Sequence, residues 1–160
     1  MKLFIVLVSV FLLFSLAQAF DFGQVQVNYD AKGKTGNVIL EYSGISAVIF
    51  DVPQTKKTVK PEDVLVFTMG TGAPKKKAET LPGTPVLWLG CSVDWVMDKP
   101  FSVTVTFPKD TTLDFSKSYT CYFLTGGKWE ETKLTPRVEA KSRTISFWMK
   151  TLGTYAISYK

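Results

Sequence analysis

Apolar and polar side chains alternate with a period of two along the C-terminal third of the chain. In residues 101–107 every odd position is apolar, and the even positions carry hydroxyl groups. Such alternation is typical of a β-strand with one buried face. Residues 118–124, 143–149 and 154–159 give further strand patterns, separated by turn residues such as Gly126 and Gly127. We expect these four strands to form one sheet, against which the rest of the chain packs.

The N-terminal part continues the same pattern. Strands are predicted at 25–29, 37–42, 47–52 and 63–69, and at 86–90, which leads into 91–96. The second and third of these flank Ser43-Gly44, which predicts a hairpin. No segment shows sustained helical periodicity. About nine strands with regular turn signals predict an all-β fold, an antiparallel β-sandwich, with a β-barrel as the alternative.

The first nineteen residues differ from the rest. Lys2 precedes an apolar run over 3–16, and Ala17-Gln18-Ala19 has the small-x-small form of a cleavage site. This is the pattern of a secretory signal peptide. The apolar run is shorter than the ~20 residues that a membrane-spanning helix needs. We therefore predict a secreted, extracellular protein with a signal peptide at 1–19, one domain at 20–160 and no transmembrane segment.

The chain has two cysteines, Cys91 and Cys121, and both fall on apolar strand faces. In an exported chain an even pair of cysteines usually forms a disulfide bond. We predict this bond, with two buried free thiols as the alternative.

The formal net charge is +5, and the basic residues gather in two loops. These basic-loop residues are Lys56, Lys57, Lys75, Lys76 and Lys77. A mild positive balance suits an anionic glycan, a lipid headgroup or a cell surface, and solvated loops are the alternative. Nucleic acid is not expected, because the chain is exported and the lysines do not follow one element.

The chain contains no histidine. Serine or cysteine nucleophiles activated by histidine are therefore excluded, and so are imidazole metal sites. Asp110 and Asp114 are four residues apart in a turn, but they lack the spacing of a calcium loop. We expect no metal site and no cofactor.

Carboxylates leave one enzymatic alternative open, a glycoside hydrolase with two acidic residues. The candidates are Glu41, Asp51, Asp94 and Asp98. Alternation directs Asp94 toward solvent, and we expect a protein that is not an enzyme.

Aromatic residues on polar strand faces give the candidate binding site. Trp148 shares its face with Ser146 and Lys150, and Tyr122 shares its face with Thr120. Trp88 lies opposite the leucines of its strand. An aromatic ring on a hydroxyl-rich face can stack on a sugar ring or contact a protein partner. A covering loop or a second sheet is the structural alternative.

Several segments of the C-terminal third keep an order found in a known kind of domain. They are residues 99–107, 122–124, 127–130, 144–147 and 152–157. This third resembles the terminal β-sandwich modules of extracellular and surface proteins, of the ankyrin and netrin-receptor type. The resemblance implies a spacer, stalk or interaction domain and assigns no site residues.

Together these observations predict a secreted, non-enzymatic binding module for a glycan or a cell-surface protein. A structural or matrix protein and a membrane-active defence protein are the alternatives.

Overall fold

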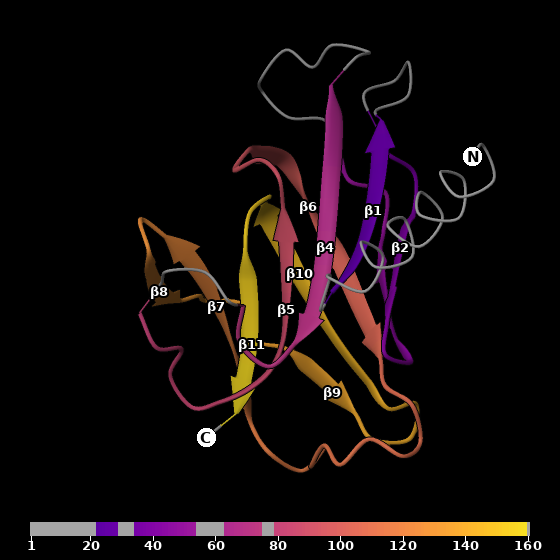
Figure 1. Cartoon of the computed structure of the whole chain (residues 1–160), viewed down its shortest axis with the longest axis vertical. Coiled ribbons are helices and arrows are strands. Elements are labelled where there is room, and N and C mark those ends of the chain that lie inside the picture. The colour runs from indigo at the N-terminus through magenta and orange to yellow at the C-terminus, as the bar shows by residue number, and fades with distance from the viewer. Residues whose placement is uncertain (1–21, 29–33, 54–62, 75–78, 160) are drawn as a thin grey trace, which may run out of the picture.

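A computed structural model describes residues 22–28, 34–53, 63–74 and 79–159. In these residues the chain forms eleven β-strands and no helix (Figure 1). The strands are β1 (Gly23–Asn28), β2 (Val38–Tyr42), β3 (Ile45–Ile49), β4 (Val64–Thr71), β5 (Thr84–Cys91), β6 (Val96–Thr106), β7 (Tyr119–Thr125), β8 (Lys128–Glu131), β9 (Arg137–Glu139), β10 (Thr144–Thr151) and β11 (Tyr155–Tyr159).

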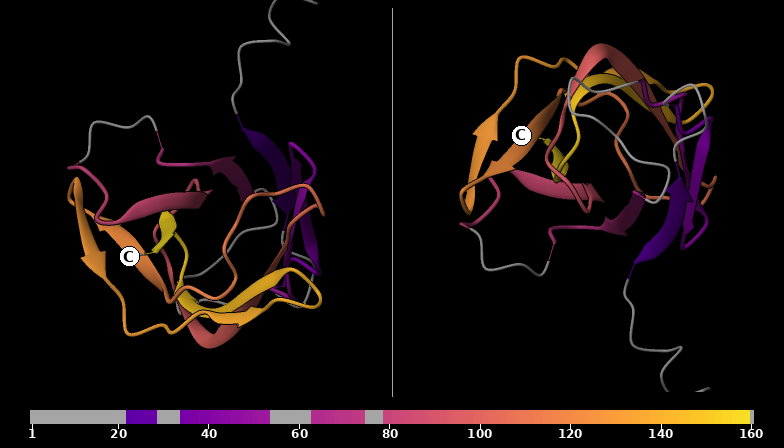
Figure 2. Two further views of the ribbon diagram at one scale, coloured as in Figure 1. Left: turned by 90° about the horizontal axis from the view of Figure 1, so that it is seen from below. Right: turned by 90° about the horizontal axis from the view of Figure 1, so that it is seen from above.

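The strands form two antiparallel sheets. Sheet A has six strands in the order β1-β4-β5-β11-β7-β8, and sheet B has five in the order β2-β3-β6-β10-β9. The two sheets pack together around a common core and do not close into a barrel (Figures 1 and 2). The predicted β-sandwich is therefore confirmed, as is the β2–β3 hairpin.

The four C-terminal strands do not share one sheet. β6 and β10 pair in sheet B, whereas β7 and β11 pair in sheet A. The prediction of a single C-terminal sheet is wrong, because alternation reports which face of a strand is buried and not which strand it pairs with. The three-residue strand β9 was not predicted, since so short a segment carries no alternation of its own.

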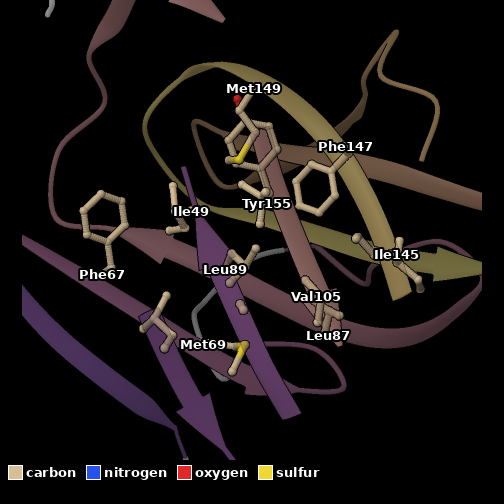
Figure 3. Packing of buried hydrophobic residues seen from close by; sticks show 14 of the residues in the cluster. Ile49, Phe67, Met69, Leu87, Leu89, Val105, Ile145, Phe147, Met149 and Tyr155 are labelled. Carbon is tan, nitrogen blue, oxygen red and sulfur yellow. The ribbon is translucent and has the colours of Figure 1, made fainter. Parts of the chain in front are cut away.

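The core lies between the inner faces of the two sheets. Figure 3 shows β4 and β5 directing side chains toward those of β6 and β10. The labelled residues are Ile49, Phe67, Met69, Leu87, Leu89, Val105, Ile145, Phe147, Met149 and Tyr155. Side chains from two inner faces interdigitate in this way in β-sandwiches. The inner face of each strand is thereby assigned, and the opposite side chains point outward.

A short corner carries the chain from sheet B to sheet A. β10 ends at Thr151 and β11 begins at Tyr155. Within the corner, the Leu152 N–H donates to the Trp95 carbonyl at 2.8 Å, and the Thr154 carbonyl accepts from the Leu124 N–H at 2.9 Å. The corner is thus hydrogen-bonded to the segments on both sides of it.

Gly153 lies at the centre of this corner, with φ of +143°. A Cβ atom there would lie 2.6 Å from a ring carbon of Phe123 and 2.8 Å from Asp94 Oδ1. The Gly153 carbonyl also accepts a hydrogen bond from the Cys91 N–H at 2.9 Å. Both the backbone angle and the lack of space require glycine at this position.

We predict that Gly153→Ala lowers the free energy of unfolding by roughly 2–5 kcal/mol, through an unfavourable φ and overpacking against Phe123. Urea unfolding measures this change. Gly126→Ala is the matched control, because Gly126 also has a positive φ (+57°) but no atom within 4 Å of the added Cβ. The control should cost about 1 kcal/mol. Equal losses in the two variants would contradict the steric role of the corner.

Candidate functional site

The outward side of sheet B presents a regular grid of side chains. Its three central strands, β3, β6 and β10, pair so that outward positions face one another in three rows. The rows are Ser46, Thr106 and Thr144; Val48, Thr104 and Ser146; and Phe50, Ser102 and Trp148. We call these nine positions the Trp148 face.

Two aromatic side chains lie in the last row of this face. Trp148 is 61% exposed and pairs with Ser102 on the neighbouring strand. Phe50 directly follows β3, and its N–H donates to the Ser102 carbonyl at 2.9 Å. Phe50 is 41% exposed, whereas its neighbour Ile49 is buried in the core. Phe50 and Trp148 therefore flank Ser102 on the same side of the sheet.

Six of the nine positions carry hydroxyl groups. Thr104 Oγ1 and Ser146 Oγ are hydrogen-bonded to each other at 2.9 Å in the middle row. The Ser102 hydroxyl has no hydrogen-bond partner among the described residues. Since a hydroxyl can both donate and accept, Ser102 is able to bind a polar group placed between the two aromatic rings.

Charged residues surround the Trp148 face but do not enter it. None of its nine positions is ionisable. Exposed charges of both signs lie on the flanking strands, with Glu41 on β2 and Arg137 and Glu139 on β9. Lys150, two residues after Trp148 on the same outward side of β10, adds a further exposed charge at the end of the third row. The face is therefore neutral at its centre and mixed in charge at its rim.

The other two aromatic candidates lie on the opposite side of the molecule. Trp88 on β5 and Tyr122 on β7 both pair with Ala156 of the intervening strand β11. Their row belongs to the outward side of sheet A. The structure thus brings Trp88 and Tyr122 together and separates both from Trp148.

Residues 79–83 cover this second row. Leu81 is buried in a small cluster with Tyr122 and Ala156, and Trp88 and Trp129 pack against that cluster. The segment is held by a hydrogen bond from the Glu79 N–H to the Gly127 carbonyl at 3.0 Å.

A second hydrogen bond, from Ser158 Oγ to the Pro82 carbonyl at 2.7 Å, holds the other end of this segment. Tyr122 is consequently only 3% exposed. Its outward position places it in a second, smaller core and not on a free surface.

Trp88 is half-buried for a related reason. Its indole extends over Gly70 on the neighbouring strand, where an added Cβ would lie 2.6 Å from Trp88 Nε1. Phe22 makes an edge-on contact with the same ring, with centroids 5.9 Å apart. Small cross-strand neighbours therefore let the indole lie against the sheet.

Sequence reasoning missed Phe50 as a site residue. Phe50 lies two residues after Val48 in the predicted strand 47–52, so alternation places both side chains on the same, outward face. The pattern does not predict the pairing of Phe50 with Ser102. That contact joins segments about fifty residues apart and follows only from the register of the sheet.

Cys91 and Cys121 are both free thiols, so the prediction of a disulfide bond between them is wrong. Strand β11 lies between their strands, which separates them by about 10 Å across the sheet. Cys91 aligns with Gly153 and Cys121 with Ile157, which adds an offset of about 13 Å along it. A disulfide needs Cα atoms within about 7 Å, so a shared apolar face is not sufficient.

The remaining candidates do not form a second site among the described residues. The basic-loop lysines 56, 57, 75, 76 and 77 and the predicted signal peptide lie outside those residues. Asp51, Asp94 and Asp98 are exposed, and Asp51 pairs with Lys34 at 3.3 Å.

Hydrogen bonds within the turn around Asp114 hold the carboxylate of this residue. Asp114 accepts hydrogen bonds from the Ser116 N–H and hydroxyl, which hold the pKa of its carboxyl below the usual value. In the residues described, no three cysteine or acidic side chains are grouped as metal ligands would be. None of those residues belongs to a helix with the length and hydropathy of a membrane span.

Comparison of the chain with protein-family models, curated proteins and solved structures gives no significant match. The resemblance of the C-terminal third to extracellular sandwich modules therefore stays a prediction.

We predict that the protein, unfolded without reductant, takes up two alkylating labels per chain. In the native state at pH 8, Cys121 should react far more slowly than in the unfolded chain, because burial raises the pKa of its thiol to about 12. Intact mass spectrometry counts the labels, with Cys121→Ala as the one-label control. A chain that takes no label unless it is first reduced would contradict the free thiols.

Alkaline pH should destabilise the fold through the same thiol. The folded pKa of Cys121, about 12, lies above the ordinary value of 9.0. Its contribution is therefore complete below pH 9 and is lost as the pH rises from 9 toward 12. Between pH 8 and about 10.5, wild type should lose about 2 kcal/mol more unfolding free energy than Cys121→Ala. Parallel pH profiles of the two proteins would refute this role.

Proposed function

We propose that this protein is an exported, non-enzymatic binding domain whose ligand lies on the Trp148 face. The ligand is an extracellular glycan or a cell-surface protein. The observation that carries the proposal is the exposed indole of Trp148. Trp148 lies on β10, a strand that is hydrogen-bonded to β6 on one side and to β9 on the other.

Exposure of this indole leaves a possible stabilisation unused. With 61% of the residue accessible, on the order of 100 Å² of aromatic surface remains in water. Burying that surface would contribute about 2–3 kcal/mol. Threonine, which occupies neighbouring positions of the face, also favours strands and has far less apolar surface to cover. A ligand that covers the indole accounts for a tryptophan at this position.

The surroundings of Trp148 support binding over catalysis. The chain has no histidine, and the nine positions of the face carry no ionisable side chain. General acid–base chemistry needs a titratable group within hydrogen-bond reach of the substrate. An open sheet face with hydroxyl and aromatic groups offers stacking and hydrogen bonds instead.

Export is supported by the sequence of residues 1–19 and is compatible with the unpaired cysteines. Cys121 is fully buried, and Cys91 is half-buried on an inward face. Burial raises the pKa of both thiols, so neither is readily ionised at neutral pH. Buried, protonated thiols are slow to oxidise, which allows them to persist outside the cell.

We predict that Trp148→Ala lowers affinity for the ligand at least about tenfold, because the indole would be desolvated in the complex. Residues 20–160 would be screened on a glycan array and against intact cell surfaces, and the strongest ligand measured with both variants.

Val64→Ala is the matched control, since Val64 is 47% exposed on the outward side of sheet A. Equal ligand affinity in the Trp148 and Val64 variants, with both folded, would place the site elsewhere.

A further inference from the structure

We infer that the Trp148 face binds a neutral, extended β-1,4-linked glycan, with alternate sugar rings stacked on Phe50 and Trp148. This inference rests on the proposed binding function and specifies its ligand. It begins from the row formed by Phe50, Ser102 and Trp148, which runs across three adjacent strands.

The spacing of the two aromatic residues is the first argument. Phe50 and Trp148 are separated by two strand spacings, so their backbone positions lie about 10 Å apart. In a flat, extended β-1,4-linked chain, alternate pyranose rings turn the same face to one side and repeat over a comparable distance. A chain lying across the strands can therefore place alternate rings on the two aromatic side chains.

The chemistry between the aromatic rings fits the intervening sugar. The C–H face of a pyranose packs against an aromatic ring, and its ring-edge hydroxyls need hydrogen-bond partners. Ser102 lies between Phe50 and Trp148, and its hydroxyl has no partner among the described residues. The adjacent row adds the hydroxyls of Thr104 and Ser146 along the same direction.

Charge selects a neutral chain. None of the nine positions is charged, and the rim holds two acidic residues, Glu41 and Glu139, and two basic residues, Arg137 and Lys150, which do not provide a field of one sign. An anionic glycan would find no cation at the centre of the face to compensate its desolvation. A neutral, hydroxyl-rich polymer carries no charge whose desolvation would need compensation.

The test is a length series of two neutral probes, cello-oligosaccharides and N-acetylated chito-oligosaccharides of one to six units, measured by calorimetry. Wild type should bind the trimer of at least one series roughly tenfold more tightly than the dimer, because only the trimer reaches both rings. Phe50→Ala should remove this step, and Phe50→Tyr, which keeps the ring, should retain it. Trp148→Ala should lose binding at every length, and Val64→Ala should match wild type.

The outcomes separate the two proposals. Affinity that does not change with chain length, or a step that survives in Phe50→Ala, overturns the two-ring site. If no oligosaccharide binds but a protein ligand is lost in Trp148→Ala, the glycan inference is wrong and the binding function stands. If a ligand binds with full affinity to folded Trp148→Ala, the proposed function fails and the inference with it. Thermal unfolding of each variant establishes that it is folded.

Discussion

The corner at residues 152–154 is the constraint on which the two-sheet arrangement depends. Two consecutive strands, β10 and β11, lie in different sheets, and only three residues connect them. Such a short connection must turn sharply and still satisfy its backbone polar groups, because an unpaired buried N–H or C=O group is costly. Gly153 allows the turn, and the neighbouring backbone bonds to Trp95 and Leu124 satisfy it. Immediately before this corner, β10 lies between β6 and β9 in sheet B, with Trp148 facing outward.

The two outward sides of the sandwich differ in how far their aromatic residues are covered. On sheet A, Leu81 buries Tyr122 and Ala156 beneath a segment that is hydrogen-bonded at both ends. On sheet B, Trp148 and Phe50 remain open to solvent. The contrast matters because aromatic residues stabilise one side and are left accessible on the other. Accessibility, and not aromatic content, singles out the Trp148 face.

The composition of that face connects the fold to the proposed function. Antiparallel register places side chains of three strands opposite one another, so that one aromatic–serine–aromatic row forms from segments distant in sequence. Flat apolar rings beside hydroxyl groups match the two kinds of surface that a sugar ring presents. The charges on β2 and β9 border the face without altering its neutral centre.

Residue alternation by itself determined the class of fold and the inward or outward direction of most side chains. Outward Trp148 and inward Cys121 follow from a period of two, which is a local property of any strand. Pairing between strands is long-range, so only the tertiary structure decided which strands share a sheet. For that reason it separated Cys91 from Cys121, covered Tyr122 with Leu81 and placed Phe50 beside Ser102. A local pattern contains no information about these contacts, because each depends on the register between segments that meet only in the folded chain.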